Sequence, residues 1–296
     1  MSIKNSELIL NSDGSIYHLH LKPSDISDTI IFVGDQDRVS EVTKHFDSIE
    51  FETQSREFKT QTGTYKGKRL SVISTGIGSD NIDIVINELD ALVNIDFKTR
   101  EIKEAKTSLS IIRIGTSGAL QPDIDIDSFL LSSYGMDING MLHSYNIETI
   151  KNDAIEQAFV KHTKWNSKKP YPIIVSNSDR LEDLLSSDQT LKGMTATCGG
   201  FYGPQGRVLR LELQDDSLNN KMDSFDFKGL KVSNFEMETS AIYGLSKLLG
   251  HEACSMNAIL ANRALGTFSK NSQETIDKLI TYTLVCVLFI KTLDLV

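Results

Sequence analysis

The chain has 296 residues, which is enough for one large domain or two medium-sized ones. Hydrophobic residues make up 40% of the sequence and charged residues 24%, a balance that excludes a disordered or fibrous protein. The formal net charge of −9 argues against a protein that mainly binds nucleic acid or an anionic membrane, because both favour a basic surface. Any anion-binding site must therefore be built locally.

The termini and the cysteines indicate a soluble cytoplasmic protein. Residues 1–13 are polar and lack the apolar core of a signal peptide, and the apolar run at 284–290 is too short to span a bilayer. The cysteines are widely spaced and show no zinc-binding pattern, so we expect buried thiols in a reducing compartment: Cys198, Cys254 and Cys286.

The first half of the chain alternates apolar runs with helix-like segments. Residues Thr29–Val33, 70–74 and 109–114 are short apolar runs that end at or near a glycine, which is typical of strands buried on both faces. Between the second and third runs, residues 80–93 carry apolar side chains at helical spacing. Alternating strands and helices predict an α/β fold.

The second half continues this pattern. Residues Thr239–Leu249 have helical spacing and precede Gly250, a suitable residue for ending a helix. Residues 253–261 read as another buried strand and 272–293 as a long packing helix. We interpret the charged stretches 96–106 and 179–192 as surface excursions, and without a repeat or linker we expect residues 1–296 to form a single domain.

A glycine and an arginine follow the first predicted strand. Gly34 allows the backbone to approach a ligand closely, and Arg38 offers a planar, charged fork to an oxyanion. A solvated polar turn would have the same sequence, so this segment alone indicates little.

Arg113 interrupts an otherwise apolar strand just before Gly115 and Thr116, which we expect to form a turn. An unpaired buried charge costs several kcal/mol, so Arg113 requires a partner. Two interpretations stay open: an ion pair with a buried carboxylate, or a phosphate cradle that Thr116 and backbone N–H groups complete.

Two carboxylates flank Met237 immediately before the helix predicted at Thr239–Leu249. Glu236 and Glu238 could cap the helix, where acidic residues are favoured. Alternatively, Glu238 could accept hydrogen bonds from a sugar diol while Met237 packs against the sugar.

Taken together, these segments resemble the uridine phosphorylase branch of the nucleoside phosphorylase-I family. The similarity runs with gaps from about Tyr17 to Arg263. The matching segments, in the family's order, are 17–19, 34–38, 55–58, 74–78, 112–122, 201–207, 234–238 and 259–263. The resemblance implies a three-layer α/β/α fold around a central mixed, partly barrel-like sheet. It implies phosphorolysis of uridine or a related pyrimidine nucleoside to the free base and ribose 1-phosphate.

The resemblance also implies a division of the site. Its phosphate-binding residues would be Gly34, Arg38, Arg56, Arg113 and Thr116, with Arg56 contributed by a neighbouring subunit. Its ribose-binding residues would be His18, Thr116, Met237 and Glu238, with His18 again from the neighbour. Its base-binding residues would be Phe201, Gln205, Arg207, Glu236, Leu260 and Ala261. The catalytic residues would be Arg113, Gln205, Arg207 and Arg263.

Inorganic phosphate would be the co-substrate, and no cofactor is expected. A monovalent cation such as K⁺ could sit at a dimer interface near Glu57 and Ile77, although 79–81 departs from the family's usual Gly-Pro-Ser. Gln36 and the Gly203-Pro204 order are further departures, and they leave closure of the pocket open. Subunits that share active sites predict a homodimer or a hexamer.

The predicted base site favours pyrimidines. Gln205 and Arg207 together match the edge of uracil, and the acid that purine-specific relatives carry near the end of the last strand is missing, where the sequence reads Leu260-Ala261-Asn262-Arg263. The alternatives are a purine nucleoside phosphorylase, a nucleosidase on the same fold, and a nucleoside-binding protein without turnover. The sequence leaves the preference among uridine, deoxyuridine and thymidine open.

Overall fold

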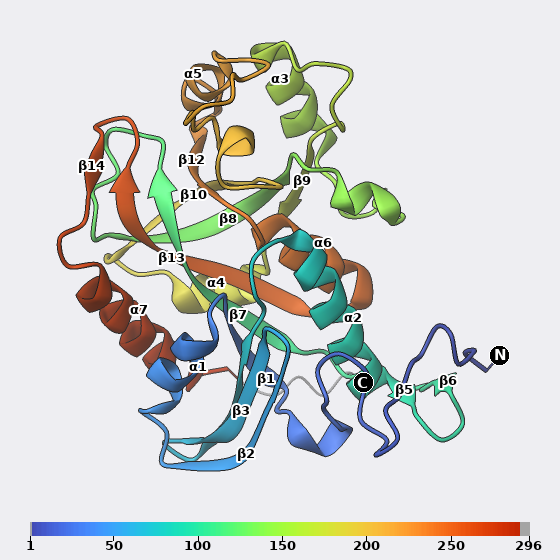
Figure 1. Cartoon of the computed structure of the whole chain (residues 1–296). Coiled ribbons are helices and arrows are strands. Elements are labelled where there is room, and N and C mark those ends of the chain that lie inside the picture. The colour runs from blue at the N-terminus through green and yellow to red at the C-terminus, as the bar shows by residue number, and fades with distance from the viewer. Residues whose placement is uncertain (1, 291–296) are drawn as a thin grey trace.

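A computed structural model of the chain describes residues 2–290 (Figure 1). The strands are β1 (Thr29–Val33), β2 (Ser48–Ser55), β3 (Phe58–Tyr65), β4 (Lys68–Ser74), β5 (Ile95–Asp96), β6 (Glu101–Ile102), β7 (Ser110–Ala119), β8 (Phe129–Asp137), β9 (Ile173–Ser176), β10 (Thr190–Thr197), β11 (Asp226–Phe227), β12 (Leu230–Glu236), β13 (Glu252–Asn262) and β14 (Thr267–Phe268). The α-helices are α1 (Gln36–Thr43), α2 (Ser79–Asn94), α3 (Asp153–Thr163), α4 (Asp179–Leu185), α5 (Leu218–Asp223), α6 (Thr239–Leu249) and α7 (Ser272–Val287). Short 3₁₀ turns are η1 (Pro23–Asp25), η2 (Met141–Ser144) and η3 (Gly203–Gln205).

The main sheet is mixed, with the order β11-β12-β10-β8-β13-β7-β1-β4-β3-β2. Strand β7 is long enough to serve two neighbours on one side. Its first half pairs with β1, and its last residues pair with β12 through Gly118–Phe235 and Ala119–Asn234. This second pairing closes a ring through β12, β10, β8, β13 and β7, so the predicted mixed, partly barrel-like sheet is confirmed.

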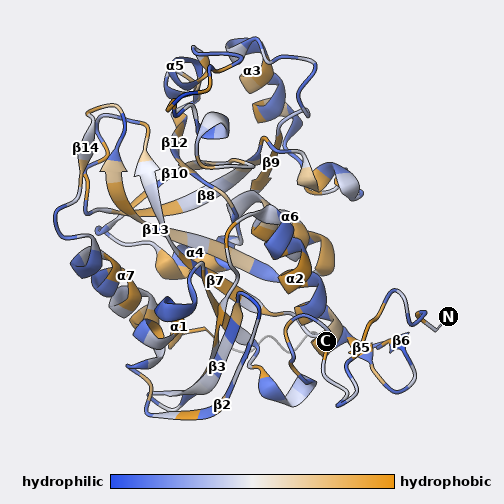
Figure 2. Ribbon diagram, in the orientation of Figure 1, coloured by the Kyte–Doolittle hydropathy of each residue, from blue (hydrophilic) through white to orange (hydrophobic). Residues whose placement is uncertain are grey.

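Helices cover both faces of the sheet where β1, β4 and β7 run parallel. Ile30 and Phe32 point to one face and pack with α2 and α6, whereas Ile31 and Val33 point to the other and pack with α1, α4 and α7. Successive residues of a strand face opposite sides, so an all-apolar strand needs a helix layer on each. Figure 2 shows apolar residues concentrated on the strands and on the inner sides of these helices. The predicted three-layer α/β/α arrangement is confirmed.

Several predicted elements have the expected bounds. Strand β1 and helix α6 begin and end at the predicted residues, and α2 extends the predicted 80–93 by one residue at each end. Gly250 follows α6 with φ of +82°, a left-handed conformation that glycine adopts without steric cost.

Other predictions were wrong in part. No turn begins at Gly115, because β7 continues to Ala119, paired with β13 along its whole length and with β12 at its end. The stretch 179–192 contains α4 and the start of β10, and 96–106 contains part of the small β5–β6 sheet. Helix α7 ends at Val287, and residues 291–293 of its predicted range lie outside the described residues. Within residues 2–290, no helix is long and apolar enough to cross a membrane.

Candidate active site

A cavity of about 700 Å³ opens where β1, β7, β12 and β13 end. The polar turn after β4 and the loop between β10 and η3 form its other walls. This cavity brings together most of the predicted site residues: Gly34, Arg38, Glu57, Ile77, Arg113, Thr116, Phe201, Gln205, Arg207, Glu236, Met237, Glu238, Leu260 and Ala261.

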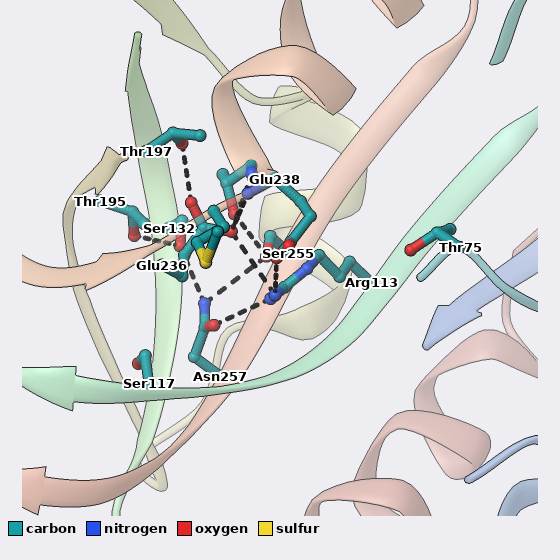
Figure 3. A network of polar contacts seen from close by, with 12 residues as sticks. Thr75, Arg113, Ser117, Ser132, Thr195, Thr197, Glu236, Glu238, Ser255 and Asn257 are labelled. Carbon is teal, nitrogen blue, oxygen red and sulfur yellow. Dashed lines mark hydrogen bonds and ion pairs between the residues drawn. The ribbon is translucent and has the colours of Figure 1, made fainter. Parts of the chain in front are cut away.

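Arg113 lines this cavity and takes part in a buried ion pair, whose partners Figure 3 shows. Its Nη2 atom is 2.6 Å from Oε2 of Glu238 and 3.5 Å from Oε2 of Glu236, and its Nη1 donates to Oδ1 of Asn257 at 3.0 Å. Burial acts to lower the pKa of Arg113, but attraction to Glu238 and Glu236 outweighs burial and raises it. The guanidinium is therefore fixed as a cation that also borders the cavity, so the two sequence interpretations of Arg113 are compatible.

Glu236 caps helix α6 with its side chain. Its Oε2 accepts the backbone N–H groups of Glu238 and Thr239, both at 2.8 Å, and its Oε1 accepts the hydroxyl of Thr197 at 2.7 Å. Burial raises the pKa of Glu236 despite the nearby Arg113. These three bonds orient the start of α6 and use most of the acceptor capacity of Glu236, whereas Glu238 accepts only two.

Glu238 is held in a different way and borders the cavity. Its Oε1 accepts the backbone N–H of Gly78 at 2.8 Å, and its Oε2 accepts from Arg113. A carboxylate offers about four lone-pair sites, so Glu238 retains acceptor capacity for hydroxyl groups. Gly78 has φ of +105°, a backbone conformation that residues other than glycine rarely adopt. This conformation directs the Gly78 N–H toward Glu238.

Arg38 supplies a second cation to the same cavity. It lies in α1, whose first turn is capped by the Asp35 side chain accepting from the N–H of Asp37 at 2.7 Å. The Nε atom of Arg38 is buried and has no hydrogen-bond partner, and Glu41 approaches only to 4.0 Å. Burial, together with repulsion from Arg113, lowers the pKa of Arg38. A buried guanidinium that lacks a full set of partners is suited to receive an anion.

Another wall of the cavity carries aromatic and amide groups. The Arg207 guanidinium stacks 3.8 Å from the Phe201 ring centroid, and its Nη1 donates to the Phe201 carbonyl at 2.7 Å and to Oε1 of Gln205. Because arginine only donates, the Gln205 oxygen must face Arg207, and the amino group of Gln205 is left for another acceptor. Arg263 lies behind this wall, where its Nη1 donates to the Gln205 carbonyl at 2.6 Å. Burial, with a smaller effect of Arg207, lowers the pKa of Arg263 to about 10.

Three predicted residues do not line the cavity of their own chain: Arg263, which bonds the Gln205 carbonyl from outside the lining, and His18 and Arg56. His18 is bonded through Nδ1 to Oε1 of Glu88 at 2.6 Å. Arg56 lies in the β2–β3 turn with φ of +54°, and its carbonyl accepts from Gln36 Nε2 at 2.5 Å. The assignment of His18 and Arg56 to a neighbouring subunit's site stays a prediction.

The predicted cation ligands lie at the edge of the cavity, where Glu57 and Ile77 both contribute to its lining. The Ile77 carbonyl accepts a hydrogen bond from Asn81 Nδ2 at 3.3 Å. Among residues 2–290, no group of three or more His, Cys, Asp or Glu side chains is arranged to hold a metal ion. The cation site near Glu57 and Ile77 stays a prediction.

Sequence reasoning missed several residues that contact or support the cavity. The cavity is also lined by Ser117, Phe235 and Phe268, and Asn257 accepts a hydrogen bond from Arg113. A polar residue inside the predicted strand 253–261 was the available signal for Asn257. The partner of Asn257 could not be predicted without the pairing of this strand with β7.

Residues 28–284 match the family model described as the phosphorylase superfamily. The chain belongs to this superfamily. The predicted family resemblance is thereby confirmed, and the match covers every predicted site residue except His18.

Individual members of the superfamily include enzymes for both base classes. A uridine phosphorylase from Thermococcus kodakarensis is 28% identical over 88% of this chain and 83% of its own length. A purine nucleoside phosphorylase of the DeoD type from Streptococcus suis is 26% identical over 87% of this chain and 92% of its own. Among solved structures, a Trypanosoma brucei nucleoside phosphorylase described as showing uridine phosphorylase activity superposes with a TM-score of 0.84 at 28% identity, covering 94% of this chain and 99% of that one.

Proposed function

We propose that this protein is a pyrimidine nucleoside phosphorylase that cleaves uridine, with inorganic phosphate, to uracil and ribose 1-phosphate. The observation that carries the proposal is the pairing of Arg38 with Arg113 in one cavity, because Arg38 has a buried Nε atom without a partner. A dianion placed between these guanidinium groups would supply the missing hydrogen bonds and balance their charge.

Other residues that line the cavity suit the nucleoside. Glu238 has lone pairs left for ribose hydroxyl groups, and Met237 offers an apolar contact on the same turn. Held about 3 Å from C1′, phosphate attacks in an effectively unimolecular step. A phosphate oxygen forms the new bond to C1′, the bond from C1′ to the base nitrogen breaks, and its electron pair leaves with the base. The proton of hydrogen phosphate is transferred, through water, to the departing base, which gives neutral uracil.

The base end supports the choice of uracil. The Gln205 amino group and the remaining N–H groups of Arg207 are donors for the uracil carbonyl oxygens, on which negative charge grows as the base leaves. The ring of Phe201 lies on the same wall. Asn262, near the position where purine-specific relatives carry an acid, instead donates to the carbonyls of Gln121 and Ile124 at 2.9 and 2.8 Å.

The assembly completes the proposal. His18 and Arg56 lie outside their own chain's cavity, which supports a homodimer or a trimer of dimers in which each subunit contributes these residues to its neighbour. A K⁺ ion near Glu57 and Ile77 would belong to that interface. We further propose that the enzyme acts in the cytoplasm and requires no other cofactor.

The direct test is to incubate the pure protein with uridine and to follow uracil formation by absorbance, with and without phosphate. We expect phosphate-dependent release and a much lower rate with inosine. Uracil release without phosphate would indicate a hydrolase, a preference for inosine would indicate a purine phosphorylase, and no release from either would indicate a binding protein. Each of these results would overturn the proposal.

An arginine variant separates the phosphate site from general charge effects. Arg38→Ala should raise the KM for phosphate at least tenfold, since a charge-assisted hydrogen bond contributes about 1.5–3 kcal/mol. The control is Lys161→Ala, which removes an exposed cation on α3 away from the cavity. Equal KM values for phosphate in the two variants would contradict the assignment of Arg38.

A further inference from the structure

Asn257 is a fully buried amide beneath the cavity, on β13. In the strand register it lies beside Gly115 of β7, and Ser255 lies beside Arg113. Figure 3 shows the Asn257 side chain directed at the Arg113 guanidinium, which Glu238 approaches from a different direction. Asn257 is thus a neighbour of Arg113 in space although 144 positions separate the two in sequence.

The path of the Arg113 side chain explains this contact. A Cβ atom on Gly115 would lie 1.8 Å from Nη1 of Arg113, so the guanidinium lies directly over the Gly115 backbone. Nη1 then meets Oδ1 of Asn257 at 3.0 Å while Nη2 meets Glu238 at 2.6 Å. The guanidinium is held at two corners by acceptors on two different elements, β13 and the start of α6.

In the chain of hydrogen bonds that continues from Asn257, the donor and the acceptor of each bond are determined. Arginine cannot accept, so the Asn257 oxygen faces Arg113 and its amino group donates to Ser132 Oγ at 3.2 Å. The Thr195 hydroxyl donates to Asn234 Oδ1 at 2.7 Å, so Ser132 must donate to Thr195, at 2.5 Å.

The same chain ends at the cavity. The Asn234 amino group donates to Ser117 Oγ at 2.9 Å, and Ser117 lines the cavity. Each intermediate group uses both a donor and an acceptor, which fixes the amide of Asn257 in one orientation.

We propose that Asn257 is a positioning residue that holds the Arg113 guanidinium between Glu238 and the phosphate subsite, an inference that rests on the proposed function. Glu236 and Glu238 already attract Arg113 from one side. The neutral Asn257 amide accepts from the other nitrogen, Nη1, and so holds it away from the carboxylates without adding negative charge. The cation therefore stays available to a phosphate dianion, which a third carboxylate would repel.

Asn257→Ala tests this role. We expect kcat/KM for phosphate to fall roughly 10- to 100-fold, because displacement of a catalytic group by about 1 Å has effects of this size. Calorimetric titration with inorganic phosphate should show a matching rise in Kd. Asn94→Ala is the matched control: Asn94 is also a buried asparagine with side-chain hydrogen bonds, but it lies at the end of α2 away from the cavity.

A double-mutant cycle distinguishes positioning from a merely structural role. If Asn257 acts through Arg113, Asn257→Ala should cost far less in an Arg113→Lys background than in the wild type. Equal costs in both backgrounds would overturn the proposal. If Asn257→Ala fails to fold, Ser132→Ala gives the second test, with a several-fold weaker phosphate affinity expected because Asn257 loses a supporting acceptor; unchanged affinity would contradict the proposal.

The titration also separates this inference from the proposed function. Wild-type protein that binds phosphate but does not cleave uridine would refute the function, while the ratio of Kd values between wild type and Asn257→Ala would still decide the role of Asn257. Wild-type protein that binds no phosphate would refute both.

Discussion

Substituting Gly115 with alanine should damage both stability and phosphate binding, because the new methyl group takes the place of the Arg113 guanidinium. The added Cβ would lie 1.8 Å from Nη1, 2.4 Å from Cζ and 2.8 Å from Nη2 of Arg113. Backbone strain is not the cause, since Gly115 has no positive φ. The arginine must move, and its contacts with Glu238 and Asn257 must lengthen or break.

The expected magnitude follows from those contacts. Arg113 and Glu238 are both buried, with side chains 8% and 7% exposed. Removing one partner of a buried ion pair costs about 3–5 kcal/mol, and here the partner is displaced rather than removed, so we expect about 3 kcal/mol. For a chain of this length that corresponds to roughly 6 °C in Tm. The kcat/KM for phosphate should fall about 100-fold.

Circular dichroism melting and steady-state kinetics with varied phosphate measure these effects. Gly118→Ala is the control for stability. Gly118 lies on the same strand as Gly115, and a Cβ atom there would meet no atom closer than 3.6 Å. Its unfolding free energy should change by less than about 1 kcal/mol. If Gly115→Ala had the melting temperature of the wild type and kept its KM for phosphate, the Arg113 guanidinium would not be fixed over Gly115.

Further predictions concern the rest of the site and the assembly. Arg113→Ala should abolish phosphate-dependent turnover, and a near-normal kcat/KM would mean that the phosphate subsite lies elsewhere. Gln205→Ala should cost uridine turnover far more than melting temperature; the reverse pattern would contradict a role in base recognition. Burial raises the pKa of Cys254 to about 12, so this thiol should resist alkylation at pH 8 in the native state, as read by mass spectrometry. Since its folded pKa lies above the ordinary value of 9.0, its contribution to stability should be present below pH 9.0 and be lost as the pH rises toward 12, which alkaline unfolding curves can test. His18 and Arg56 predict an inactive monomer, and sedimentation alongside the uridine assay would expose an active one.

The sequence by itself determined the elements with strong local signals. The all-apolar run Thr29–Val33 and the helical spacing of Thr239–Leu249 required no knowledge of distant residues, and both predictions match the structure. The family segments also placed Arg38, Arg113 and Glu238 in one site, and the cavity does bring them together.

Tertiary structure decided the features that depend on pairing between distant segments. The predicted turn at Gly115 was wrong because local sequence cannot show that β12 and β13 extend the strand, nor that the glycine makes room for Arg113. The partner of Arg113 was open between a carboxylate and a phosphate until the fold placed Glu238 at 2.6 Å and Asn257 at 3.0 Å. Hydrogen bonds depend on atomic positions to within tenths of an ångström, and the sheet register that sets those positions is formed between residues more than a hundred positions apart.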